Sequence, residues 1–105
     1  MYARIHHTAI KVKNLEWYIH FFTEVFGMEI ERTAGASPER KVWFKEGIQL
    51  NEEMHFGKDG VMDHIGIETD SMERILKKSK EYGCTSLPNG ENWFQTPDGI
   101  RIELK

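Results

Sequence analysis

The sequence has few features that would cross-link the chain or place it in a membrane. Cys84 is the single cysteine among 105 residues, which excludes an intrachain disulfide framework and is typical of a reducing compartment. Neither a signal-peptide-like apolar start nor an apolar stretch of about eighteen residues occurs, so we predict no membrane span. Long blocks of like charge are also missing at a net charge of -3. We therefore predict a cytoplasmic protein that binds neither nucleic acid nor membranes.

The sequence does contain an internal repeat. The stretch His7-Thr-Ala-Ile10 returns as His64-Ile-Gly-Ile67, and three shorter pairs return in the same order: Phe26-Gly27 as Tyr82-Gly83, Trp43-Phe44 as Trp93-Phe94, and Gly47-Ile48 as Gly99-Ile100. The length predicts one domain over residues 1–105. We expect it to consist of a module over about 1–54, a linker over 55–60 and a second module over about 61–105.

Hydrophobic periodicity predicts the same elements in both halves. Apolar residues at helical spacing predict a helix over 15–26, capped by Asn14, and another that ends at residue 82 after a cap at Asp70 or Ser71. Alternating or short apolar runs predict strands over 4–12, 28–33, 41–45, 48–52, 62–69, 85–87, 92–95 and 100–104. Each half is then a βαβββ module. A ferredoxin-like double repeat is the rival, but it lacks the additional hairpin after each helix.

Neither half can close a core alone, so we predict an α+β fold in which two βαβββ modules form a cup-shaped eight-stranded sheet. If the helices cover the apolar strand faces, the polar faces line the cup. Those faces carry His7, His64 and Glu103, with either Gln49 or Asn51. Arg101 shares the face of Glu103 and could pair with an anionic group of a substrate.

Two imidazoles and one carboxylate from separate strands indicate a site for a divalent metal. Zinc, iron(II), manganese, nickel and cobalt all accept such ligands. Three protein ligands leave positions for water or substrate, which is typical of catalytic sites. A lone strand histidine more often serves packing, and Glu103 could be a solvated residue near the chain end. The equivalent positions of His7 and His64 in the repeat favour the metal site.

Four segments together resemble the vicinal oxygen chelate superfamily, which includes glyoxalase I, bleomycin-resistance proteins, methylmalonyl-CoA epimerase and extradiol dioxygenases. They are His7-Thr-Ala-Ile-Lys-Val, Phe21-Phe-Thr-Glu-Val-Phe-Gly-Met28, Asp63-His-Ile-Gly-Ile and Thr96-Pro-Asp-Gly-Ile-Arg-Ile-Glu-Leu104. The resemblance covers the whole chain. It implies paired βαβββ modules around a metal, with His7, His64 and Glu103 at ligand positions.

The sequence departs from glyoxalase-like members at the fourth ligand position. Those members carry a glutamate in the last strand of the first module. Counting from the turn glycines places Asn51 opposite Glu103, and a register shift of two places Gln49 there instead. Neither residue is a carboxylate, so Glu103 is the one catalytic acid at these positions. Glu53 and Glu68 are further acids that could act as a second base.

Two main functions stay open at this stage. The first is a metal-dependent enzyme with lyase- or isomerase-type chemistry on a small substrate that chelates the metal through oxygens, with Gln49, Asn51 and Arg101 near the substrate. The alternative is a non-catalytic small-molecule-binding protein of the bleomycin-resistance type. A structural dimer-forming domain is a third reading. We also expect a homodimer, with Trp17 and Phe21 as a possible contact.

Overall fold

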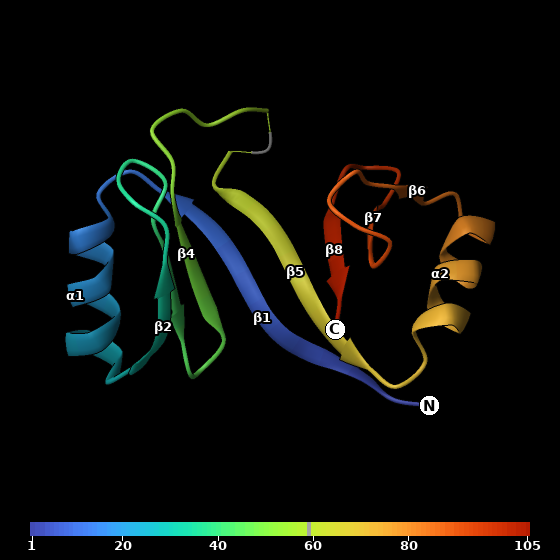
Figure 1. Ribbon diagram of the computed structural model, residues 1–105, viewed down its shortest axis with the longest axis horizontal. Helices are drawn as coiled ribbons and strands as arrows, with labels where there is room; N and C mark the ends of the chain where they lie inside the picture. The colour runs from blue at the N-terminus through green and yellow to red at the C-terminus, as the bar shows by residue number, and fades with distance from the viewer. Residues whose placement is uncertain (59) are drawn as a thin grey trace. The chain divides into compact units, whose positions relative to one another are not determined.

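The computed structural model describes residues 1–58 and 60–105 (Figure 1). Residue 59, which belongs to the predicted linker 55–60, lies outside the described residues. The elements are β1 (Ala3–Val12), α1 (Leu15–Phe26), β2 (Ile30–Ala34), β3 (Lys41–Phe44), β4 (Ile48–Glu52), β5 (Met62–Thr69), α2 (Met72–Glu81), β6 (Thr85–Ser86), β7 (Trp93–Gln95) and β8 (Arg101–Leu104). Each predicted element is present, with ends that agree to within two residues.

The chain divides into two compact units. One spans 7–63, and the other joins 1–6 to 64–105, so β1 contributes residues to both. In the first unit the strand order is β2-β3-β4-β1, and in the second it is β6-β7-β8-β5. The first strand of each module pairs in parallel with the last one, whereas the hairpin strands are antiparallel. This repeated βαβββ order confirms the predicted α+β fold class with eight strands and excludes the ferredoxin-like rival.

In the unit 7–63, α1 covers one face of the strands. The Asn14 side chain accepts a hydrogen bond from the Trp17 amide (3.2 Å) and so caps the helix as predicted. Gly27 follows with φ 69°, a left-handed conformation that glycine adopts without strain. The core beneath α1 contains five buried residues: Val12, Leu15, Val42, Phe44 and Leu50. The opposite face of these strands is therefore free to carry polar side chains.

In the unit 1–6 and 64–105, α2 lies over the apolar side of β7 and β8, where Ile75 of α2 lines a cavity with Phe94 and Ile102. Ser71 occupies the N-cap position of α2, but its side chain does not cap the helix. Of the two predicted caps, Ser71 and not Asp70 is at the N-cap, and Asp70 Oδ1 instead accepts from the Tyr2 amide (3.1 Å) and the Ser71 hydroxyl (2.9 Å). The Asp70 carboxylate is thus used to hold the N-terminal segment.

One buried ion pair connects the segment before β3 to the end of β4. Glu52 is only 7% exposed and accepts hydrogen bonds from Arg40 Nε (3.0 Å), Arg40 Nη2 (2.8 Å) and the Arg40 amide (3.1 Å). Arg40 also contacts Glu16 of α1 at 2.6 Å. The hydrogen bonds from the Arg40 side chain hold the pKa of Glu52 below its ordinary value of 4.5.

This arrangement predicts a pH-dependent loss of stability in Glu52→Gln. A lowered folded-state pKa gives stability that is complete above the unfolded pKa and is lost as the pH falls through the folded value. We expect the variant to unfold at least about 5 °C below wild type at pH 7, because it leaves Arg40 without its buried partner. The difference should shrink below a pH of about 4.5, as thermal unfolding from pH 7 to 3 would show. A difference that stays constant with pH would contradict the assignment, and the exposed Glu24→Gln should match wild type throughout.

Candidate metal centre

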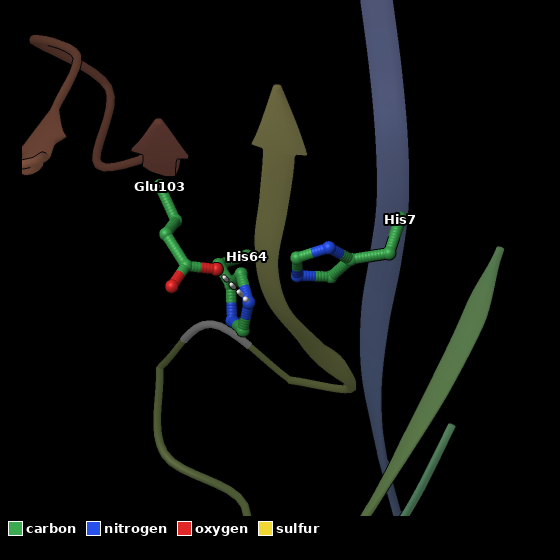
Figure 2. Close-up of side chains that lie close together, drawn as sticks. All are labelled: His7, His64 and Glu103. Carbon is green, nitrogen blue, oxygen red and sulfur yellow. Dashed lines mark ion pairs between the residues drawn. The ribbon is translucent and has the colours of Figure 1, made fainter. Parts of the chain in front are cut away.

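His64 and Glu103 lie side by side on neighbouring parallel strands. The register pairs Gly66 of β5 with Glu103 of β8, so the alternating side chains of His64 and Glu103 leave the same face, away from α2. His64 Nε2 lies 3.6 Å from Glu103 Oε1, the contact that is dashed in Figure 2. The His64 side chain is 6% exposed and the Glu103 side chain 19%. A buried imidazole therefore meets a carboxylate that retains some contact with solvent.

Trp93 holds this pair from the neighbouring strand. It is the direct partner of Glu103 in the antiparallel β7–β8 ladder. Its ring lies 4.6 Å from the His64 ring, centroid to centroid, with the planes at 65° in an edge-to-face contact. Trp93 thus forms part of the wall beside His64 and Glu103. This packing restricts the rotamers of the imidazole.

The donor geometry of the pair fits a divalent metal. Histidine nitrogen and carboxylate oxygen bind zinc-like ions at about 2.0–2.2 Å, so two adjacent ligands of one ion lie about 3.0–3.4 Å apart. The observed 3.6 Å separation between Nε2 and Oε1 is close to that range. A small side-chain rotation would bring both atoms into one coordination shell.

His7 occupies the equivalent position in the other module. It is 5% exposed and lies two residues before Ala9, the residue that pairs with Gln49. In the same way, His64 lies two residues before Gly66, the residue that pairs with Glu103. His7, His64 and Glu103, the three metal ligands predicted from the sequence, are the side chains that Figure 2 draws.

The strand registers decide between the two candidates for the fourth position. Trp43 pairs with Gln49 in the first module, and its repeat equivalent Trp93 pairs with Glu103 in the second. Both the hairpin ladder and the parallel ladder therefore make Gln49, and not Asn51, the structural equivalent of Glu103. Gln49 is also buried, at 4% exposure.

Counting from the turn glycines pointed to Asn51 because the two hairpins differ in length. The first hairpin turns through residues 45–47, a longer connection than the predicted two-residue turn. The second has the additional pair Gln95–Arg101 and turns through residues 96–100. Glu103 is consequently two positions further from Gly99 than Gln49 is from Gly47. Only the ladder reveals this offset.

A hydrogen-bonded relay orients the Gln49 amide. Asn51 Nδ2 donates to Asp63 Oδ2 (3.2 Å), and Gln49 Nε2 donates to Asn51 Oδ1 (2.9 Å). Because an ionised carboxylate only accepts hydrogen bonds, Asp63 sets the direction of both amides. The relay uses the amino group of Gln49 and turns its oxygen, the atom that can bind a metal, away from Asn51. No sequence signal marked Asp63 for this role.

The other polar candidates lie elsewhere. His6, His20 and His55 are exposed. Glu53 is exposed, and Glu68 accepts from Arg4 (2.9 Å) and the Tyr2 hydroxyl (3.1 Å), contacts that lower the pKa of its carboxyl. Glu68 is thus part of a surface cluster rather than a second base. Arg101, on β8, lies on the same strand face as Glu103.

A separate cavity of about 360 Å³ lies between α2 and the sheet, lined in part by Ile75, Phe94 and Ile102. Phe94 and Ile102 are paired strand neighbours that point away from the face of Glu103, so the cavity lies across the sheet from the His64–Glu103 pair. No helix among residues 1–58 and 60–105 is long and apolar enough to cross a membrane.

Comparison with known proteins identifies the family. The model of the Glyoxalase/Bleomycin resistance protein/Dioxygenase superfamily matches residues 4–104. The uncharacterized protein YwbC of Bacillus subtilis is 30% identical over 123 residues, covering 99% of this chain and 98% of YwbC.

Solved structures show the same fold. A hypothetical protein of Bacillus halodurans has a TM-score of 0.72 at 15% identity, covering 99% of this chain and 94% of that one. A variant of Streptomyces coelicolor methylmalonyl-CoA epimerase, in complex with 2-nitronate-propionyl-CoA, has a TM-score of 0.70 at 20% identity, covering 96% and 94%. At these identities the structures support the fold, and the family match covers nearly the whole chain. The chain therefore belongs to the Glyoxalase/Bleomycin resistance protein/Dioxygenase superfamily.

Proposed function

We propose that this protein is a small metal-dependent enzyme with isomerase- or lyase-type chemistry on a substrate that chelates the metal through oxygens. His7, His64 and Glu103 would hold one divalent ion, and the amide oxygen of Gln49 would complete the protein ligands. The observation that carries the proposal is the buried His64 imidazole beside the Glu103 carboxylate, 3.6 Å away on the neighbouring strand.

Two further observations support this function. The Asp63–Asn51–Gln49 relay presents an amide oxygen at the position equivalent to Glu103. Methylmalonyl-CoA epimerase, an isomerase, is among the proteins of similar fold, and one such structure contains methylmalonyl-CoA. We take only the type of chemistry from this likeness, because the identity is 19%.

The residues present suggest a reaction with one base. A bound metal would stabilise the negative charge that develops on a substrate oxygen when a neighbouring proton leaves. Glu103 is the group that could accept this proton, since carboxylates at such sites act as general bases. Gln49 has no acid–base capacity near neutral pH, so it can orient a substrate but cannot return a proton from the opposite side.

Gln49 provides a test of the ligand assignment. We expect Gln49→Ala to weaken the binding of Mn²⁺ or Zn²⁺ at least about tenfold, because it removes a ligand oxygen. Gln49→Glu should bind the ion at least as tightly as wild type. Asn51→Ala should fall between wild type and Gln49→Ala, because it only frees the Gln49 amide to rotate.

The measurement is a metal titration of the EDTA-treated protein, purified without a histidine tag and checked by circular dichroism. Binding of one ion per chain in that order of affinities supports the proposal. A larger loss in Asn51→Ala than in Gln49→Ala would instead make Asn51 the ligand. Unchanged affinity in all three variants would remove both residues from the metal shell.

The uncharged Gln49 also favours the second candidate function, a binding protein of the bleomycin-resistance type. That function requires neither a second base nor a metal. The titration separates the two, because a binder of this kind would take up no stoichiometric divalent ion.

Other aspects of the proposal stay predictions. They are the single domain with modules over 1–54 and 61–105, the placement of Arg101 near an anionic part of the substrate, the homodimer and the cytoplasmic location. Trp17 on α1 is 53% exposed and stacks on Phe21 with a centroid distance of 5.0 Å. Sedimentation of the purified protein would test the dimer.

A further inference from the structure

The strand face of the unit 7–63 that lies opposite α1 carries a concentration of positive charge. The ladders place Arg32 beside Trp43 and Trp43 beside Gln49. In the next row Asn51 lies between Lys41 on β3 and Lys11 on β1. The strand residues that the registers and the alternation put on this face are His7, Ala9, Lys11, Arg32, Ala34, Lys41, Trp43, Gln49 and Asn51.

The charges on this face are mostly positive. None of the strand residues just given is acidic, and the carboxylate beside them, Asp63, accepts a hydrogen bond from Asn51 (3.2 Å). Within residues 1–58 and 60–105, no carboxylate forms an ion pair with Arg32, Lys41 or Lys11. By contrast, nearby Lys45 is paired with Glu29 at 3.1 Å. Unneutralised cations on one face raise the local potential and favour an anionic ligand.

The guanidinium group of Arg32 is oriented so that it can bind an oxyanion. Its guanidinium carbon lies 3.9 Å from the centroid of the Trp43 ring, and Arg32 itself is exposed. Stacking on an aromatic ring orients the guanidinium plane but leaves its N–H groups at the edge for hydrogen bonds. Carboxylates and phosphates accept two of these bonds at once.

We propose that this face is a binding site for the carboxylate or phosphate group of a small substrate, with Arg32 as the bidentate donor and Lys41 as a second cation. The strand spacing puts the backbone of Arg32 about 10 Å from the backbone of Gln49, two strands away. This proposal rests on the metal-dependent function proposed above only in placing a metal ion next to Gln49. The substrate would then be an anion whose second charged group lies on the Trp43 side of its metal-chelating oxygens, where the Arg32 guanidinium stacks.

The experiment uses EDTA-treated protein, so that its outcome does not depend on metal binding. Succinate and inorganic phosphate are the two anionic probes, and uncharged succinamide is the matched neutral probe. Binding is followed by the indole N–H resonance of Trp43, which Trp43→Phe assigns. We expect one anion to bind in the millimolar range and succinamide to leave the resonance unchanged. The anion that binds identifies the charged group as carboxylate or phosphate.

Variants with equal changes in net charge test the location. Arg32→Gln and Lys41→Gln should each weaken the affinity for the anion about fivefold or more. Lys45→Gln removes a charge that is already paired with Glu29, so it should change this affinity less than twofold. Equal losses in all three variants, or no binding of either anion to the metal-free protein, would overturn the proposal. A failed metal titration with intact succinate or phosphate binding would overturn only the metal-dependent function.

Discussion

Replacing His64 by alanine should reduce the bound divalent metal from about one ion per chain to a background level. The imidazole is buried against Trp93 with its Nε2 atom 3.6 Å from Glu103, so the substitution removes a ligand atom from the interior of the site. Loss of one of three strong ligands from a small metal site costs orders of magnitude in affinity, because the remaining donors must bind a more hydrated ion. Metal analysis of the dialysed protein by mass spectrometry measures the result directly.

His20→Ala is the matched control for this experiment. His20 lies on α1 with a 70% exposed side chain, and its nearest acid, Glu24, is 4.0 Å away. The substitution has the same chemistry as His64→Ala but should leave the metal content unchanged. If both variants retain one ion, the metal site lies elsewhere in the protein. Circular dichroism of His64→Ala must match wild type, so that a loss of metal is not a loss of fold.

The second large effect is expected from Leu50→Ala, which should destabilise the protein by about 2–5 kcal/mol. Leu50 has 0% exposure and belongs to the core beneath α1. Truncation removes buried apolar surface and leaves a cavity, which the paired strands on both sides of β4 cannot easily close. A domain of this size has a total stability of roughly 5–15 kcal/mol, so the loss should appear as a large shift in the urea midpoint.

Leu50 also affects the candidate site indirectly. It stands between Gln49 and Asn51, whose side chains point to the opposite face of β4. We therefore expect Leu50→Ala to weaken metal binding as well, through a less rigid strand. Val25→Ala on α1, where Val25 is 63% exposed, should change the stability by less than about 0.5 kcal/mol and leave metal binding intact. Equal stabilities of the two variants would contradict the assignment of the core.

Much of the fold could be predicted from local sequence patterns. The helix of Leu15–Phe26 follows from its apolar spacing, the Asn14 cap and the terminal Gly27, all of which lie within one continuous segment. The alternation in β5 and β8 placed His64 and Glu103 on polar faces for the same reason. Duplication of these patterns then predicted two equal modules, and the equal strand orders of the two units agree with that expectation.

The Asp70 prediction shows where local reasoning fails. Asp70 has the spacing of a capping residue, but the Tyr2 amide, far away in the sequence, occupies its carboxylate. A carboxylate can accept hydrogen bonds from only some of the donors near it, and the tertiary structure determines which donors lie within reach. The same holds for Glu68, a candidate base in the sequence that the folded chain commits to Arg4 and Tyr2.

The sequence by itself determined the family pattern, the helices and strands, and which residues of each strand share a face, because these depend on the identities and spacings of nearby residues. Only the tertiary structure decided that Gln49 rather than Asn51 is the counterpart of Glu103, that Asp63 orients it, and that Arg32 stacks on Trp43. Those facts depend on strand register. Register is set by hairpin length and by pairing between distant segments, and a shift of two residues preserves the alternation that the sequence displays.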